Sequence, residues 1–222
     1  MGKTRHGRDW KVEHLNDPYV KQAKKDGYRS RAIYKLDEID KKDRLFRPGM
    51  TVIDLGAAPG SWSEYAVKKV GDTGKVIALD LLEMDAIPGV TFVAGDFREQ
   101  DVYDALLKEI EAEQGNTAES GAKSEKYPGK VDLVMSDMAP NISGMKVVDQ
   151  PRAMHLVELS LELAQSVLKP NGVLLVKVFS GSGLEEFNQL LRQHFKRVVA
   201  RKPKASRSRS AEHYLLASGY NV

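Results

Sequence analysis

The chain has 222 residues, of which 41% are hydrophobic and 29% are charged, a balance typical of globular proteins that excludes a wholly disordered chain. It has no cysteine, which excludes disulfides, thiolate nucleophiles and cysteine-bound metals, and its five histidines lack paired ligand spacing, so we expect no metal site. No run approaches the roughly 20 apolar residues of a membrane span, and the N-terminus lacks a signal-peptide core, so we expect a cytoplasmic protein that does not bind membranes.

The formal net charge of +3 divides into three zones. Residues 1–50 hold 14 basic and 8 acidic side chains (+6), residues 51–191 hold 12 and 22 (−10), and residues 192–210 hold 8 and none (+8). Two basic ends beside an acidic body indicate a polyanionic partner next to the core. A solvated charged surface is the alternative explanation of the same pattern.

The N-terminal part of the chain is polar and basic. Residues 1–28 show little periodicity, which predicts an extended or partly flexible basic arm. Residues 30–43 repeat apolar side chains at helical spacing, and Pro48-Gly49 then interrupts the chain before the first predicted strand.

Short apolar runs then alternate with segments of helical period, which is typical of βαβ units and a mostly parallel sheet. We predict helices at 62–70, 101–112, 151–168 and 184–194, the third ended by a turn at 170–172. The last two strands have only about ten residues between them, so we expect an antiparallel pair at one edge. The predicted strands are 51–56, 75–81, 91–97, 131–137, 172–179, 197–202 and 213–219.

One further segment differs in composition. Residues 113–130 are rich in glycine, serine, alanine and charge, and we expect a flexible surface excursion there. Residues 29–222 are then expected to form a single domain.

The segment VIDLGAAPGSW leads from a strand through a glycine-containing turn into a helix. Glycines allow a ligand to approach the main chain closely, and ligands of doubly wound sheets bind at the carboxyl ends of the strands. The spacing from Gly56 to Gly60 is not the G-x-G-x-x-G of dinucleotide enzymes. This disfavours a nicotinamide-dependent reductase.

Two carboxylates near this turn favour an adenosine ligand. Asp80 ends the second predicted strand, where it can accept hydrogen bonds from ribose hydroxyls, and Asp96 ends the third, where it can accept from an adenine amino group. Asp54 precedes the turn, where it either orients the loop or approaches a positively charged part of the ligand. Turn glycines and helix-capping acids without any ligand are the structural alternative.

Lys177 is the most informative residue, because it interrupts a strand that otherwise reads as buried on both faces. A buried lysine needs a partner or a chemical role. Asp137 ends the neighbouring predicted strand, and parallel pairing would bring it to the same edge. Glu212 begins the last strand and is the only acid between Arg192 and the C-terminus.

The sequence resembles the FtsJ family of RNA 2′-O-ribose methyltransferases. The resemblance runs in order from about residue 29 to 219 through RSRAIYKLDEI, DLGAAPGSWS, ALDLLEMD, GDF, SDMAPNISG, LLVKVFSGSG and SRSAEHYLLASG. It implies a Rossmann-like class I S-adenosylmethionine-dependent methyltransferase fold, an α/β fold with a mostly parallel seven-stranded sheet and an antiparallel edge strand. The excursion at 113–130 looks longer than is usual in the family.

The resemblance also implies site residues and a substrate. The family's catalytic tetrad falls on Lys35, Asp137, Lys177 and Glu212, and the S-adenosyl-L-methionine site falls on Gly60, Trp62, Asp80, Asp96 and Asp137, to which the turn residues Asp54 and Gly56 are added. The implied substrate is a uridine of 23S ribosomal RNA (rRNA), methylated in the assembled large ribosomal subunit. Nothing fixes the oligomeric state, and a monomer is the working expectation.

The role of Lys177 stays open between two interpretations. A lysine that acts as a base must be desolvated or lie near another cation, which Lys35 would supply, whereas neighbouring acids oppose that role. In the second interpretation, Lys177 only orients the hydroxyl. The competing function is an inactive methyltransferase-fold protein that binds RNA; it would be free to lose a tetrad residue, and none is lost here.

Overall fold

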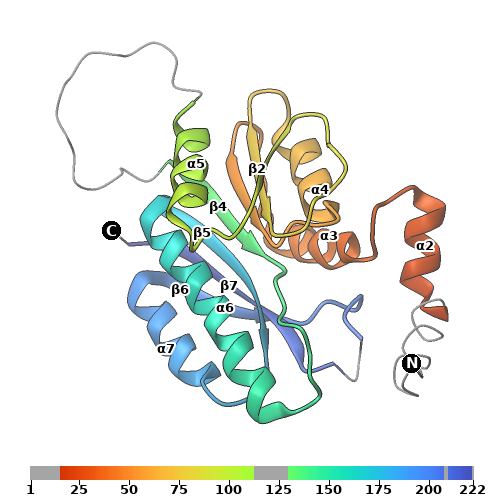
Figure 1. The fold of residues 1–222 in the computed structure, drawn as a ribbon, viewed down its shortest axis with the longest axis vertical. Helices are drawn as coiled ribbons and strands as arrows, with labels where there is room; N and C mark the ends of the chain where they lie inside the picture. Colours follow the sequence, from red (N-terminus) through yellow and green to blue (C-terminus); the bar gives the residue numbers. More distant parts are fainter. Residues whose placement is uncertain (1–15, 113–129, 208–209, 222) are drawn as a thin grey trace.

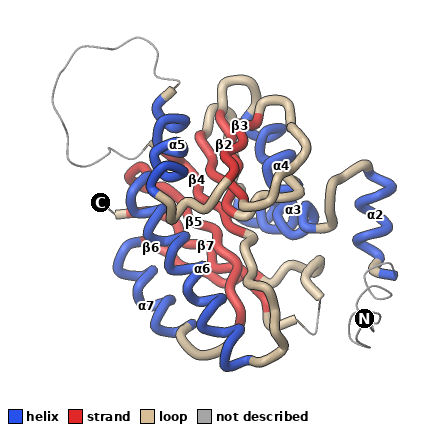
Figure 2. Tube along the Cα trace, viewed as in Figure 1, coloured by secondary structure: helices blue, strands red, loops and turns tan. Residues whose placement is uncertain are grey.

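The computed structural model describes residues 16–112, 130–207 and 210–221. Its centre is a seven-stranded sheet in the order β3-β2-β1-β4-β5-β7-β6, with helices on both faces (Figures 1 and 2). This arrangement confirms the predicted Rossmann-like α/β fold.

Strands β1 to β5 pair in parallel, and β7 runs antiparallel to both β5 and β6. The predicted antiparallel pair therefore lies at one edge, with β6 outermost and β7 inside it. The strands are β1 (Thr51–Leu55), β2 (Lys75–Asp80), β3 (Val90–Ala94), β4 (Val131–Ser136), β5 (Leu168–Phe179), β6 (Phe195–Arg201) and β7 (Glu212–Tyr220).

Side chains alternate along each strand and build two hydrophobic cores. Helices α3 and α4 cover one core, which contains Leu36, Trp62 and Tyr214. Helices α5, α6 and α7 cover the other, which contains Leu106 and Leu161. The helices are α2 (Pro18–Asp26), α3 (Ala32–Asp43), α4 (Ser61–Val70), α5 (Gln100–Glu111), α6 (Lys146–Val167) and α7 (Leu184–His194).

The N-terminal segment differs from the expected extended arm. Residues 18–26 form helix α2, so the prediction for residues 1–28 is wrong over this stretch. The Asp17 side chain accepts from the Tyr19 amide at 3.0 Å, Pro18 occupies the first turn, and Gly27 ends the helix at a φ of 74°. These end signals outweigh the weak periodicity. Residues 1–15 and the predicted excursion at 113–129 lie outside the described residues.

Helix α6 also differs from the prediction at both ends. It begins at Lys146 rather than at residue 151, because the Asp149 carboxylate accepts from the amides of Ser143 (2.8 Å) and Gly144 (2.9 Å) and holds an extra turn. It ends at Val167, and β5 follows directly. The predicted turn at 170–172 lies inside β5, where the register with β4 shifts and Asn171 has a φ of 65°.

Candidate active site

The candidate site lies at the carboxyl ends of β1, β2, β4 and β5. The strand order reverses between β1 and β4, which is where ligands bind in open α/β sheets. Because β7 is antiparallel, it begins at this edge with Glu212 paired to Phe179, the last residue of β5. Helix α3, which packs with α4 on one face of the sheet, contributes Lys35.

Lys177 and Asp137 form the first ion pair of the site. The Lys177 side chain is only 8% exposed, and its Nζ lies 3.0 Å from Oδ1 of Asp137. It also donates to the main-chain carbonyl of Asp137. The parallel pairing of β4 with β5 sets Ser136 beside Val176 and so brings the next residue of each strand together.

Lys35 and Glu212 form the second ion pair. The Lys35 Nζ lies 2.6 Å from Oε1 of Glu212, and both side chains are largely buried. The Ser206 hydroxyl donates to the same oxygen at 2.8 Å. Glu212 therefore has a fixed orientation at the edge of the site.

Tyr214 connects the two ion pairs and was not selected from the sequence. Its buried hydroxyl donates to Oδ1 of Asp137 at 2.6 Å, and Lys35 Nζ lies 5.8 Å from the centre of its ring. Burial, together with the charges of Asp137 and Glu212, raises the Tyr214 pKa well above its usual value. The signal that marks this residue is its position two residues after Glu212, on the same side of a strand.

The two acids of the ion pairs are ionised. Burial alone would raise the pKa of Asp137, but Lys177, Lys35 and the Tyr214 hydroxyl outweigh burial and hold the pKa below its usual value. For Glu212, burial is likewise outweighed by Lys35, and its pKa is also lowered. The four predicted catalytic residues thus form one cluster of opposite charges.

The turn after β1 has little room for side chains. A Cβ at Gly56 would lie 2.5 Å from the Met138 side chain, and one at Gly60 would lie 2.6 Å from that of Ile87. Both glycines have positive φ angles, of 72° and 98°. Glycine is therefore required at each position.

Asp54 lies near the end of β1, two residues before Gly56, and is fully buried. Its Oδ2 accepts from the Ser63 hydroxyl at 2.6 Å, whereas its Oδ1 has no hydrogen-bond partner. Burial raises the pKa of Asp54 to about 7, against the lowering effect of the Ser63 hydroxyl. An unpaired buried carboxylate oxygen at a strand end is suited to a polar or positively charged ligand group.

The other predicted cofactor residues hold the surrounding loops. Asp80 accepts from the amides of Ala58 (2.9 Å) and Leu82 (2.8 Å), and both oxygens of Asp96 accept from Arg98. Each oxygen of Asp80 keeps a second lone pair for a ligand donor. Each oxygen of Asp96 already accepts twice from Arg98, so a ligand donor there would displace part of that exposed arginine side chain. Trp62 is buried, and its indole N–H donates to the Ala32 carbonyl, so what it offers a ligand is its main-chain amide in the first turn of α4.

The basic ends of the chain are partly used inside the fold. Arg201 forms two hydrogen bonds of 2.6 Å with Asp43, and Arg31 and Arg207 both pair with Asp17. These charges stabilise the structure as well as adding to its positive potential. Lys24 and Lys25, in the last turn of α2, are exposed.

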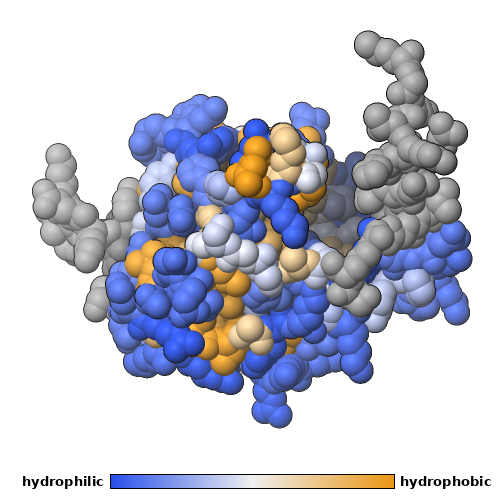
Figure 3. Space-filling model, turned by 90° about the horizontal axis from the view of Figure 1, so that it is seen from below, coloured by the Kyte–Doolittle hydropathy of each residue, from blue (hydrophilic) through white to orange (hydrophobic). Residues whose placement is uncertain are grey.

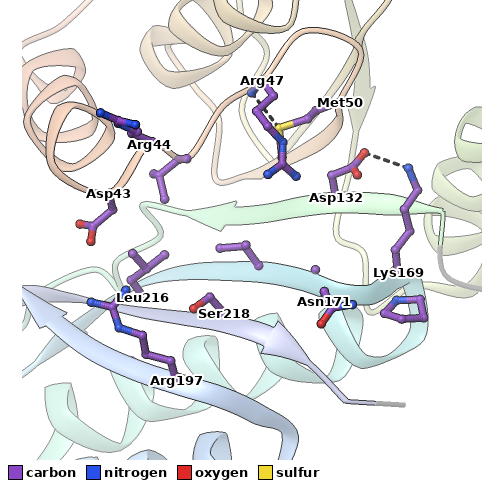
Figure 4. Close-up of a pocket in the computed structure, with 14 residues that line it drawn as sticks. Asp43, Arg44, Arg47, Met50, Asp132, Lys169, Asn171, Arg197, Leu216 and Ser218 are labelled. Atoms are coloured by element: carbon purple, nitrogen blue, oxygen red, sulfur yellow. Dashed lines mark hydrogen bonds and ion pairs between the residues drawn. The ribbon is translucent and has the colours of Figure 1, made fainter.

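A cavity lies at the end of the sheet opposite to the candidate active site. Its volume is about 210 Å³, and Arg44, Arg47 and Arg197 line it together with the Asp132–Lys169 ion pair (Figure 4). It is bordered by the residue before β1 and the first residues of β5. The length of the strands therefore separates this cavity from the four predicted catalytic residues.

Membrane-spanning helices and clusters of metal ligands are both absent from residues 16–112, 130–207 and 210–221. None of the helices described is long and apolar enough to cross a membrane. The same residues contain no group of three or more histidine, aspartate or glutamate side chains that would hold a metal ion.

Comparison with known proteins extends these findings. A ribosomal RNA large subunit methyltransferase E of Hydrogenovibrio crunogenus is 53% identical over 219 residues, which cover 99% of this chain and 98% of the relative. The protein of the same name from Legionella pneumophila strain Corby is 50% identical over the whole of both chains. A solved chain described as a ribosomal RNA methyltransferase from Plasmodium falciparum has a TM-score of 0.70 at 28% identity, covering 87% of this chain and 98% of that one.

A sequence model of FtsJ-like methyltransferases matches residues 28–220. These residues include both ion pairs and the glycine turn. The chain therefore belongs to the FtsJ-like methyltransferase family.

Proposed function

We propose that this protein transfers a methyl group from S-adenosylmethionine to the ribose 2′-hydroxyl of a uridine in 23S rRNA, within the assembled large ribosomal subunit. Family membership and two relatives named ribosomal RNA large subunit methyltransferase E support the reaction class and the substrate. The observation that carries the proposal is the pair of buried ion pairs, Lys177–Asp137 and Lys35–Glu212, beside the glycine turn.

The residues around the turn suit S-adenosylmethionine. Asp80 would hold the ribose hydroxyls, Asp96 the adenine amino group, and the main chain from Gly56 to Trp62 the centre of the molecule. The free oxygen of Asp54 and the carboxylate of Asp137 would face the amino and sulfonium groups. When bound, S-adenosylmethionine supplies an electrophilic methyl group attached to a sulfonium.

Lys177 is assigned to the acceptor oxygen. Its ammonium group has three N–H donors, of which two bind Asp137, leaving the third for the ribose O2′. Asp137 and Tyr214 keep the lysine in one orientation, and Lys35 with Glu212 closes the other side of the acceptor position. This arrangement holds the hydroxyl in line, which is the main requirement of a displacement at a methyl group. The hydroxyl proton would pass to the neutral form of Lys177 in the base role, or to water in the orienting role.

The test is methyl transfer by the purified protein. Large ribosomal subunits from a strain that lacks the activity are incubated with S-adenosylmethionine carrying a labelled methyl group. We expect label in 23S rRNA at a single uridine whose 3′ phosphodiester resists alkaline hydrolysis, because a 2′-O-methyl group blocks that cleavage. Label on a base, or RNA binding without any transfer, would contradict the proposal; the second result is what an inactive RNA-binding protein predicts.

A further inference from the structure

A cavity of about 460 Å³ lies at the carboxyl end of β5, where Phe179 lines it two residues beyond Lys177. One wall comes from the loop before α6 and its first turns, with Ile142, Val147 and Gln150. The other comes from the end of β5 and the residue before β7, with Phe179, Ser180 and Ala211. Its size is within the range of small-ligand sites.

The cavity reaches the ends of the two strands that carry Lys177 and Glu212, because Phe179 and Ala211 line it. Phe179 follows Lys177 by two residues on β5, so it lies roughly 7 Å further along and leaves the sheet on the same side. It is also the strand partner of Glu212. The Ser180 amide donates to the Ala211 carbonyl at 3.0 Å, which fixes the floor beside Glu212.

Phe179 is an aromatic residue that neither core uses. It is half-buried, and it is absent from both clusters of packed hydrophobic residues in the part of the chain that the structure describes. Its ring therefore has surface left to contact a ligand.

The edge of the cavity formed by the loop before α6 and the first turn of α6, here called the lip, is apolar and exposed. Two residues that line the cavity, Ile142 and Val147, are 64% and 84% exposed, and the nearby Met145 is 58% exposed. Apolar residues gather on the face of the molecule seen in Figure 3. Asp149 holds this lip in place through its bonds to Ser143 and Gly144. An ordered group of exposed apolar side chains beside a site of chemistry indicates a binding surface.

Gln150 supplies the polar group of the cavity. Its amide nitrogen donates to the carbonyls of Phe179 (3.3 Å) and Ser182 (3.0 Å), so its Oε1 is the atom that remains to accept a hydrogen bond. A Cβ on Gly181 would lie 2.5 Å from the Gln150 amide carbon, so the glycine allows this position of the amide.

We propose that this cavity binds one unpaired nucleobase of the RNA, within one nucleotide of the methylated ribose. A base is a flat ring with N–H groups on its edge, and it would stack on Phe179, contact Val147 and donate to Gln150. Aromatic stacking and edge hydrogen bonds are how proteins read unpaired RNA. The proposal rests on the proposed function and adds that the acceptor segment is single-stranded when bound.

Kinetics on large subunits test the stacking contact. Phe179→Leu keeps apolar bulk but loses the ring, and we expect it to raise the KM for large subunits about ten-fold while the KM for S-adenosylmethionine stays unchanged. Phe179→Tyr keeps the ring and should restore the wild-type KM. Equal KM values for the Leu variant and the wild type would overturn the proposal. Wild-type turnover in the same assay tests the proposed function separately.

Val147 at the edge of the cavity is exposed, so its substitution should leave the fold intact. Val147→Ala should raise the KM for large subunits, whereas Leu190→Ala, which changes a partly exposed apolar residue on α7, serves as the matched control and should not. An equal effect of the two substitutions would contradict the proposal.

Photocrosslinking identifies the occupant directly. Large subunits that carry 4-thiouridine are irradiated with the protein, and the crosslinked peptides are located by mass spectrometry. Crosslinks from the methylated uridine or its neighbours to residues 142–153 or 179–182 support the proposal. Crosslinks of these nucleotides only to other segments, or of a ribosomal protein to this cavity, overturn it.

Discussion

The ammonium group of Lys35 on α3 lies 2.6 Å from the carboxylate of Glu212 on β7, so helix α3 is joined to strand β7 at the candidate active site. Both side chains are largely buried, and removal of either partner leaves a charge without compensation. The ion pair therefore has a structural consequence that can be separated from its proposed catalytic one.

Lys35→Met and Glu212→Gln should each lower the free energy of unfolding by about 3 kcal/mol, because each leaves a buried charge unpaired. The double variant should lose less than the sum of the two, and all three should be inactive. Urea unfolding provides the measurement. Lys41→Met with Asp37→Asn is the control, since that pair is exposed and should couple by less than about 1 kcal/mol.

Replacement of Lys177 separates its two possible roles. Lys177→Ala should abolish methyl transfer but keep the affinity for S-adenosylmethionine, measured by calorimetry. Lys177→Arg keeps a donor near the hydroxyl but cannot take up its proton. We expect Lys177→Arg to be inactive in methyl transfer if Lys177 is the base. Substantial methyl transfer by this variant would assign Lys177 to orienting the hydroxyl.

Asp80→Asn should weaken S-adenosylmethionine binding by at least about ten-fold, since an amide retains one acceptor oxygen where the carboxylate offers two. The substitution preserves size and keeps an acceptor for the Ala58 or Leu82 amide. Isothermal calorimetry with Asp104→Asn, an exposed acid on α5, provides the comparison. A folded Asp80 variant with wild-type affinity would remove this residue from the proposed site.

Asp54 should make stability depend on pH. Its pKa is about 7 in the folded protein and near 4 when unfolded, so between these values the folded state holds a proton that the unfolded state has lost. Its contribution to stability therefore declines as the pH rises from about 4 to about 7 and is constant above that range. The free energy of unfolding of Asp54→Asn should therefore rise relative to that of the wild type, by about 2 to 4 kcal/mol in total as the pH goes from about 4 to about 7. A difference that is flat with pH would contradict the raised pKa.

The exposed lysines of α2 test the RNA contact. Lys24→Gln with Lys25→Gln should reduce the dependence of RNA affinity on salt, because each lost phosphate contact removes about 0.7 to 0.9 from the log–log slope. The control, Lys41→Gln with Lys42→Gln, changes two lysines in the equivalent last turn of α3, which leads toward the opposite end of the sheet. Equal slopes for both double variants would show that α2 does not touch the phosphates.

The sequence predicted those parts of the site that depend on neighbouring strands. Asp137 follows β4 and Lys177 lies near the end of the adjacent parallel strand β5, so the order of the buried runs was sufficient to place them together. Lys35 was assigned to the site only by family resemblance, because helical periodicity does not say which strand α3 packs against. Tyr214 was missed because an aromatic residue in a strand usually belongs to the core, although its position two residues after Glu212 places it on the same side of β7. Phe179 was missed for the same reason. Helix α2 was missed because its capping residues stand in a segment without periodicity.

The position of β7 has a consequence for synthesis of the chain. This strand lies between β5 and β6, yet it is made after both of them. Until it emerges from the ribosome, β5 has one unpaired edge and β6 has no partner, while Lys35 and Lys177 lack Glu212 and Tyr214. The nascent protein therefore cannot complete the candidate active site before β7 is released, and the exposed edge of β5 is the point at which an incomplete chain is most prone to pair with another.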